Sequence, residues 1–242
     1  MQINKSLALG AIILGTAVVI STMIGAYTFY KVRALDDVLT VTGSARMEAV
    51  ADKVKWVAVI NRPTTPRTLK GGYEQMANDL VLVKKFYADN GIDEKTVSIS
   101  PVFMDEVYTN YMATGSDKQY NLRQTFLIDS TDVEGITKLT KSTQALIEKG
   151  VVFSTQTLEY SYSKLPEARV ALLSDATKDA KARAGELVSG TGKRVGKLKN
   201  ASSGVVQVLA KGSNEVSDYG AYDMSTIEKS IMVTVKATFA LE

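Results

Sequence analysis

The residue types that most often carry out enzyme chemistry are missing from this chain. Its 242 residues include no cysteine and no histidine. This composition excludes disulfides, thiol nucleophiles, Ser-His-Asp and Cys-His catalysis, and ordinary zinc or haem sites. A bound metal would have to be a hard ion with oxygen ligands. We therefore expect a protein that is not an enzyme and that has no cofactor.

Acidic side chains are the remaining candidates for chemistry. They form two sequence pairs, Asp36-Asp37 and Asp105-Glu106. Four more lie along one loop: Glu215, Asp218, Asp223 and Glu228. Two carboxylates can hydrolyse a glycosidic bond or bind calcium. However, no D-x-D-x-D-G calcium pattern is present, and adjacent carboxylates on polar loops are usually solvated. We assign no catalytic, cofactor-binding or metal-binding residue.

The segment Gly190-Thr191-Gly192-Lys193 has part of a phosphate-loop pattern, G-x-x-x-x-G-K-[ST]. Leu187 stands where the first glycine is required, and Arg194 stands where a hydroxyl would bind magnesium. The segment also follows a predicted helix instead of preceding one, so it presents the wrong end of the helix dipole to a phosphate. We interpret it as a helix cap.

Tyrosines in polar company indicate a binding surface. Tyr108, Tyr111 and Tyr120 flank one long loop, and Tyr219 and Tyr222 lie in another. Exposed tyrosine is favoured at protein interfaces because it buries a large area at a small entropy cost. Our hypothesis is that Tyr108, Tyr111, Tyr219 and Tyr222 contact neighbouring subunits. The alternative is ordinary loop packing within one subunit.

The elements that must position these residues begin with a long apolar stretch. From Ser6 to Tyr30 no residue is charged, and Lys5, Lys31 and Arg33 flank the stretch. A helix of this length spans roughly 37 Å, enough to cross a hydrocarbon core of about 30 Å. The apolar region of a cleaved signal peptide is shorter, roughly 7 to 15 residues. We therefore favour an uncleaved signal anchor over residues 1–33, with a cleaved signal as the alternative.

The basic flanks do not fix the orientation of this anchor, because Lys5 and the terminal amine balance Lys31 and Arg33. A first apolar segment normally acts as an export signal, so we expect a single-pass protein of a bacterial inner membrane with residues 34–242 in the periplasm.

Small residues within the anchor suggest contacts between helices. Ala17, Ser21 and Gly25 are four residues apart and share one helix face. In lipid, small residues let two helices approach closely. This pattern predicts helix packing within an oligomer, although small residues are also simply common in membrane helices.

The exported part carries no net charge. Of the 29 lysines and arginines, three flank the apolar stretch, which leaves 26 basic residues against 26 acidic ones. Nucleic-acid binding depends on neutralising phosphates. We therefore expect no nucleic-acid partner.

Hydrophobic periodicity predicts strands that alternate with helices. The expected helices are at about 68–90, 131–149 and 163–189. In the second we expect Ile147 to face inward, and in the third we expect a buried, alanine-rich stripe that includes Ala176, Ala180 and Leu187. The expected strands are at 38–44, 53–61, 96–104, 120–129, 151–163, 204–209 and 231–241. A helix after each group of strands indicates an α+β fold in which an antiparallel sheet packs on helices. Residues 34–242 form one ectodomain, with possible subdomains at about 38–130 and 150–242.

The order of elements and three motifs resemble the SIMPL-domain family of YggE-like bacterial proteins, a domain of unknown function. The motifs are the opening VTGSARMEAVADKVKW, the passage TVSISPVF, and the helix EARVALLSDATKDAKARAGELVSGTGKRVGKL. The last contains the D-A-x-x-R-A-x-x-L pattern at Asp179, Ala180, Arg183, Ala184 and Leu187. The sequence differs from the family at 50–53, where VADK replaces an opening P-D-x-A.

The resemblance implies an exported protein of the bacterial envelope that assembles into a large ring- or cage-like homo-oligomer and is linked to oxidative stress. It implies no catalytic residues. We expect a membrane-anchored scaffold. The alternative is a ligand- or protein-binding module of the envelope without catalytic activity, and an enzyme is the third reading.

Overall fold

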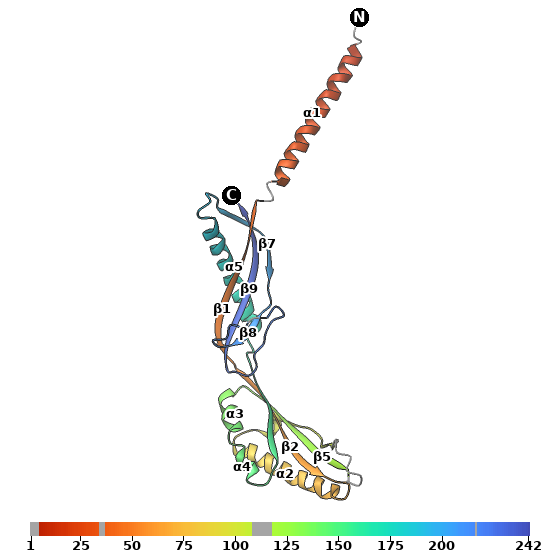
Figure 1. Ribbon diagram of the computed structural model, residues 1–242, viewed down its shortest axis with the longest axis vertical. Helices are drawn as coiled ribbons and strands as arrows, with labels where there is room; N and C mark the ends of the chain where they lie inside the picture. The colour runs from red at the N-terminus through yellow and green to blue at the C-terminus, as the bar shows by residue number, and fades with distance from the viewer. Residues whose placement is uncertain (1–4, 34–36, 108–117, 216) are drawn as a thin grey trace. The chain divides into compact units, whose positions relative to one another are not determined.

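The computed structural model describes residues 5–33, 37–107, 118–215 and 217–242. The helices are α1 (Lys5–Arg33), α2 (Leu69–Asp89), η2 (Glu94–Thr96), α3 (Val133–Thr140), α4 (Gln144–Ile147) and α5 (Leu165–Val188). The strands are β1 (Val38–Val50), β2 (Lys53–Thr64), β3 (Val97–Ile99), β4 (Phe103–Val107), β5 (Gln119–Ser130), β6 (Phe153–Ser161), β7 (Val195–Ser203), β8 (Gln207–Ala210) and β9 (Glu228–Leu241). The fold is α+β with antiparallel pairing, as the sequence predicts (Figure 1).

Two compact units alternate along the chain. The first unit is made of Met1–Ala45, Val170–Val205 and Val233–Glu242, and the second of Arg46–Arg169 and Val206–Met232. β1, α5 and β9 each pass from one unit into the other. The suggested subdomains at about 38–130 and 150–242 stay a prediction, because compactness does not test whether a segment folds alone.

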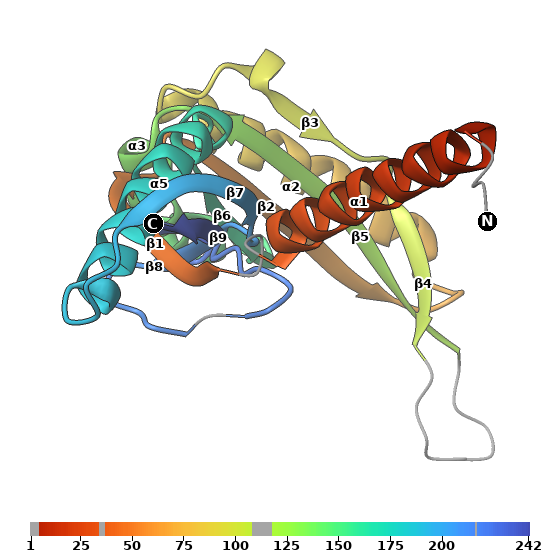
Figure 2. The same cartoon turned by 90° about the horizontal axis from the view of Figure 1, so that it is seen from above.

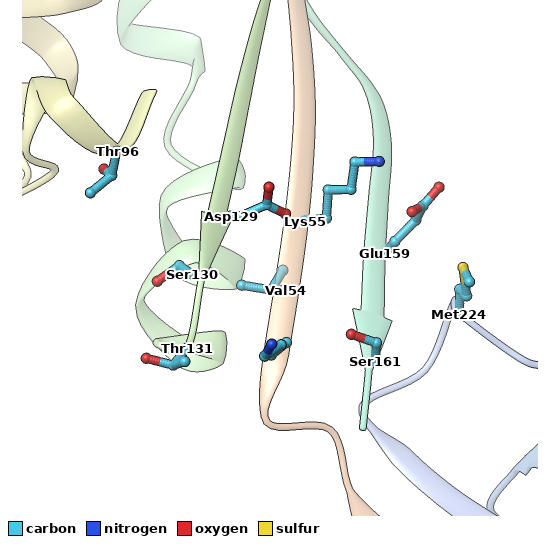
Figure 3. A pocket seen from close by; sticks show the side chains of 10 residues that line it. Val54, Lys55, Thr96, Asp129, Ser130, Thr131, Glu159, Ser161 and Met224 are labelled. Atoms are coloured by element: carbon cyan, nitrogen blue, oxygen red, sulfur yellow. The ribbon is translucent and has the colours of Figure 1, made fainter. Parts of the chain in front are cut away.

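The second unit contains a five-stranded antiparallel sheet with the order β3-β5-β2-β6. β4 also pairs with β5, and Figure 2 shows β3 and β4 one after the other along the same side of that strand. β5, β2 and β6 lie side by side (Figure 3). α2 and α3 contact β2 and supply the cover for one face of the sheet.

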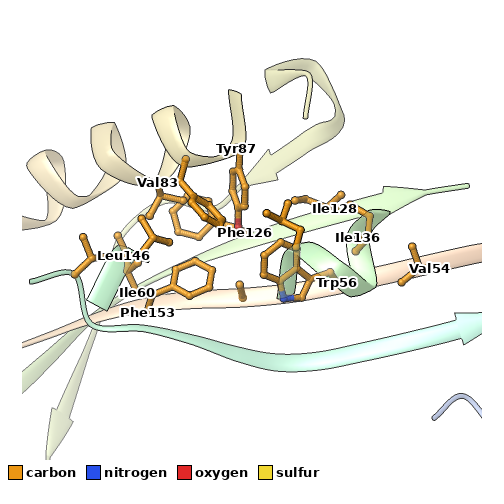
Figure 4. Packing of buried hydrophobic residues seen from close by; sticks show 14 of the residues in the cluster. Val54, Trp56, Ile60, Val83, Tyr87, Phe126, Ile128, Ile136, Leu146 and Phe153 are labelled. Carbon is orange, nitrogen blue, oxygen red and sulfur yellow. The ribbon is translucent and has the colours of Figure 1, made fainter. Parts of the chain in front are cut away.

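The core of the second unit follows from the alternation predicted for 53–61. Val54, Trp56, Ala58 and Ile60 are all buried, at 1 % exposure or less. Trp56 packs edge-on against Tyr87 of α2, with ring centroids 5.7 Å apart, in a cluster that also holds Phe126 (Figure 4). Aromatic pairs in this geometry add to the free energy of burial. The core therefore joins α2 to the two central strands.

The first unit packs α5 on the sheet β1-β9-β7 (Figure 1). Ala176, Ala180 and Ala184 of α5 are fully buried against Val235 and Phe239. The alanine stripe predicted for this helix is thus confirmed. β8 pairs instead with the first residues of β9, which belong to the second unit.

Three expectations about helices were wrong in detail. Leu187 was expected to be buried but is 62 % exposed, because Val188 continues the inward spacing of four from Ala184. The expected helix at 131–149 is divided into α3 and α4. Ser142 and Thr143 donate their hydroxyls to the carbonyls of Leu139 and Thr140, and such bonds compete with a regular helix. Ile147, also expected inside, is 52 % exposed.

β2 continues past Pro63, where the sequence predicts an end. Asn61 donates its backbone N–H to Val152, so the nitrogen of Pro63, two residues on, faces the same side of the strand. Pairing with β6 has already ended at Ile60. A proline there leaves no hydrogen bond unmade, and the pairing of Pro63 with Asn121 of β5 persists.

The prediction missed β7 completely. All of its residues from Lys197 to Ser203 are exposed, so no buried face gives it an apolar alternation. Hydrogen bonds to β9 hold it in the sheet, and lysines on such an edge strand discourage further pairing.

Candidate functional site

A hollow in the second unit opens over three neighbouring strands (Figure 3). Its volume is about 770 Å³, and its walls include Lys55 of β2, Asp129 of β5 and Glu159 of β6. Lys55 is in register with Asp129 on one side and with Glu159 on the other. Alternation along β2 puts Lys55 on the face opposite Trp56. The strands thus place one cation between two carboxylates.

A second lysine, Lys53, also lines this hollow, together with Val54, hydroxyl groups and Met224. The hydroxyl of Ser130 accepts the backbone N–H of Asp132 at 3.0 Å, so this oxygen already serves the start of α3. The hollow therefore offers charges of both signs and a thioether surface. This set of groups suits the binding of a small polar molecule that carries both charges.

The sequence pairs of carboxylates are held by basic partners. Asp37 pairs with Lys193 at 2.5 Å, Asp105 with Arg123 at 3.3 Å, and Glu106 with Lys118 at 3.2 Å. Asp36 lies outside the described residues. Among the residues that the structure describes, no group of three or more acidic side chains could hold a metal ion. These carboxylates act as partners in surface ion pairs.

Asp223, in the loop before β9, accepts several hydrogen bonds from its surroundings. It accepts the backbone N–H groups of Ser225 and Thr226 at 3.1 and 3.2 Å, their hydroxyls, and the Nζ of Lys229 at 3.3 Å. Burial by itself would raise the pKa of Asp223, but these hydrogen bonds outweigh it and lower the pKa well below its usual range.

Lys229 is completely buried beneath this carboxylate. Burial lowers its pKa, and Asp223 opposes that effect. Its Nζ also donates to the backbone carbonyl of Asp223 at 2.5 Å. The pair ties the loop before β9 to the strand, and we interpret it as structural.

Glu228 belongs to a second, exposed group. Lys211 lies 3.6 Å from Glu228 and 3.4 Å from Glu48, and these two charges raise the pKa of Lys211. Glu215 and Asp218 lie on the same loop.

The chain matches the model of a known protein family. Residues 39–239 match the family model SIMPL, described as "Protein of unknown function (DUF541)". The chain belongs to the SIMPL family. The match includes residues of both compact units and confirms the resemblance seen in the sequence. No curated protein matches the chain.

The D-A-x-x-R-A-x-x-L pattern of α5 has a structural role in this SIMPL domain. Asp179 accepts the backbone N–H of Ser44 at 2.8 Å and pairs with Arg183 at 2.8 Å. Arg183 in turn donates to the hydroxyl of Ser44 at 3.3 Å. The hydrogen bonds from Ser44 and Arg183 lower the pKa of Asp179. The pattern therefore fixes α5 to β1.

The glycine segment after α5 is a helix cap, as the sequence indicates. Thr191 donates both its backbone N–H and its hydroxyl to the carbonyl of Val188. Gly192 follows with a φ of 75°, a conformation that favours glycine.

Two of the four tyrosine candidates, Tyr219 and Tyr222, lie within the described residues. Tyr219 is 95 % exposed, whereas Tyr222 is 39 % exposed and its hydroxyl accepts the backbone N–H of Tyr162 at 3.4 Å. Tyr108 and Tyr111 lie outside the described residues. Subunit contact by these tyrosines stays a prediction.

Ala17, Ser21 and Gly25 lie in the apolar span Leu9–Val32, of which none is buried within the chain. The space around Gly25 is open to at least 4 Å. Packing between such helices also stays a prediction.

The second unit also contains a partly buried ion pair that was not predicted from the sequence. Arg62 donates to both oxygens of Asp79, at 2.6 and 2.8 Å, and to the carbonyl of Gly150 at 2.5 Å. The bond to Asp79 raises the pKa of Arg62. The only signal was a carboxylate on the apolar stripe of α2, three residues after Met76. The pair joins α2, β2 and the segment before β6.

Proposed function

We propose that this SIMPL protein is a non-catalytic structural protein of the bacterial envelope. In this proposal α1 anchors it in the inner membrane, the SIMPL domain lies in the periplasm, and copies assemble into a large ring- or cage-like homo-oligomer. A link to envelope or oxidative stress belongs to the proposal through the family resemblance alone.

One observation carries the membrane part of the proposal. The span Leu9–Val32 has 24 residues, a mean hydropathy of 2.1 and no buried residue. At 1.5 Å per residue it measures about 36 Å, which exceeds the hydrocarbon core of a bilayer. An uncovered apolar surface of this size is unfavourable in water. A lipid bilayer can cover this apolar surface. The helix is stable there because its backbone hydrogen bonds are made within the helix.

Flotation of the full-length chain with neutral vesicles tests this part. We expect the full chain to float and a variant that starts at Asp37 to stay with the soluble fraction. The intact mass of the protein isolated from membranes distinguishes an anchor from a cleaved signal. A mature mass that lacks α1 would contradict the anchor.

Exposed apolar groups support self-assembly. Val170 of α5 is 70 % exposed, and Tyr219 is almost fully exposed. Residues 34–242 have no net charge, so electrostatic repulsion between copies should be weak. Light scattering coupled to size exclusion, followed by negative-stain images of the detergent-solubilised protein, provides the test. A large closed particle is expected, and a monomer would contradict the proposal.

The hollow around Lys55 favours a second candidate, a binding module of the envelope. A small zwitterion would place its anionic group on Lys55 and its cationic group on one of the flanking carboxylates, Asp129 or Glu159. Thermal unfolding with a panel of zwitterionic amino acids tests this function. Stabilisation that disappears in Lys55→Gln, in a protein that is a monomer, would favour the module over the scaffold.

A further inference from the structure

A basic groove lies in the first unit between α5 and the start of β7. Its volume is about 550 Å³. Lys178 and Lys181 line it from the helix and Lys197 lines it from the strand, with Leu198 and Phe239 as apolar lining and Glu242 as the acidic residue. Three ammonium groups therefore face one carboxylate.

Two of these lysines are available for a ligand. Lys178 pairs with Asp175 at 2.9 Å. Lys181 and Lys197 are exposed, and neither belongs to an ion pair of the described residues. The side chain of Glu242 packs on Gly196, and its backbone N–H donates to Arg194 at 2.9 Å. The groove thus keeps an excess of positive charge above an apolar surface.

The covalent chain places this groove next to the end of α1. Only residues 34–36 separate Arg33 from Asp37, so four Cα steps of about 3.8 Å allow at most about 15 Å between them. The carbonyl of Asp37 accepts the backbone N–H of Leu241 at 2.8 Å, and Leu241 pairs with Val195, which lines the groove. Adjacent strands lie about 4.8 Å apart. A membrane that holds α1 therefore has its headgroups within reach of the groove.

The chemistry of the groove matches a phosphodiester headgroup. Ammonium groups bind phosphate as point charges, and basic residues close to a bilayer attract anionic lipids. Leu198 is 47 % exposed within the groove and offers contact to the glycerol and the first methylenes of a lipid. A soluble anion would make no use of this apolar surface.

We propose that this groove binds the headgroup of an anionic phospholipid from the membrane that holds α1, with Lys181 and Lys197 on its phosphate. The inference rests on the membrane anchoring proposed above. Such a contact fixes the first unit at the membrane surface and makes the anchored domain sensitive to lipid charge.

Native mass spectrometry of the full-length protein in a mild non-ionic detergent tests this site. The protein is incubated with equal amounts of phosphatidylglycerol and phosphatidylcholine. We expect retention of phosphatidylglycerol at least ten-fold above phosphatidylcholine, and loss of that preference in Lys181→Gln/Lys197→Gln. The matched control is Lys199→Gln/Lys236→Gln, which removes two exposed lysines of the same unit that do not line the groove. This control variant should keep the preference for phosphatidylglycerol.

Two outcomes would overturn the inference. Unchanged retention in Lys181→Gln/Lys197→Gln would place the lipid elsewhere, for example at Lys31. Displacement of the lipid by a few millimolar inorganic phosphate would identify a site for a soluble anion. Flotation with neutral vesicles separates this result from the anchor itself, because Lys181→Gln/Lys197→Gln still floats if only the groove is lost.

Discussion

Gly43 of β1 lies directly against Ala180 of α5. A Cβ on Gly43 would be 2.7 Å from the Cβ of Ala180 and would overlap the carbonyl oxygen of Ala176. This contact is tighter than side chains allow, so the strand requires glycine at this position. The hydrogen bond from Ser44 to Asp179 follows at the next residue.

Replacement of Gly43 by alanine should therefore destabilise the first unit. The added methyl meets backbone atoms that cannot rotate away, and overpacking of this kind costs about 2 kcal/mol. For a domain of this size the melting temperature falls by roughly 4 to 8 °C. Circular dichroism of the full-length protein in detergent measures the change.

Gly71→Ala is the matched control for this prediction. Gly71 lies in α2, and the space around it is open. Alanine is the better helix former, so this variant should gain about 0.5 to 1 kcal/mol. Equal melting temperatures for Gly43→Ala and Gly71→Ala would contradict the close contact.

Removal of a buried hydroxyl in the second unit should stabilise the protein, in contrast to Gly43→Ala. Tyr87 is 2 % exposed, and its hydroxyl oxygen lacks a hydrogen-bond partner among the described residues. Burial also raises its pKa far above the usual value. Tyr87→Phe should keep the ring contacts with Trp56 and Phe126 and raise the free energy of unfolding by about 1 kcal/mol.

Tyr160→Phe serves as the comparison, because the Tyr160 hydroxyl is bonded to Thr137 at 2.9 Å. Its loss should cost about 1 kcal/mol. If chemical denaturation finds Tyr87→Phe as destabilising as Tyr160→Phe, the hydroxyl of Tyr87 has a partner in solution.

The sequence predicts elements that have a buried face, but it does not predict contacts between distant segments. The buried alternation of Val54 to Ile60 and of β9 predicts strands correctly, because a half-buried sheet imposes a period of two. β7 was not predicted, because its exposed residues show no alternation of apolar and polar side chains. The role of Gly43 depends on a helix more than 130 residues away. Nothing near Gly43 in the sequence reports that packing.

Acid should unfold the protein partly through Asp223. Its pKa is lowered in the folded state, so below about pH 4 the unfolded state binds more protons than the folded state. The stability from Asp223 is complete above that pH and is lost as the pH falls towards the folded-state pKa. Asp223→Asn should weaken the fall in melting temperature between pH 5 and pH 2.

Asp52 and Asp179 also have lowered pKa values, so some sensitivity to acid remains in this variant. At pH 7, loss of the charged hydrogen bonds from Ser225, Thr226 and Lys229 should cost about 2 kcal/mol. Asp175→Asn, which removes an exposed pair with Lys178, should follow the wild-type curve. Parallel curves for Asp223→Asn and the wild type would exclude Asp223 as the source.

The exposed ring of Tyr219 should matter for assembly and not for folding. A side chain that is 95 % exposed contributes little to the stability of a single chain. At an interface, however, a tyrosine buries 150 Å² or more and is often among the residues that dominate affinity. Tyr219→Ser should therefore keep the melting temperature and weaken self-association at least ten-fold, measured as particle mass by light scattering over a dilution series. Tyr219→Phe retains the ring and should assemble as the wild type does, whereas an unchanged mass for Tyr219→Ser would remove this loop from the subunit contact.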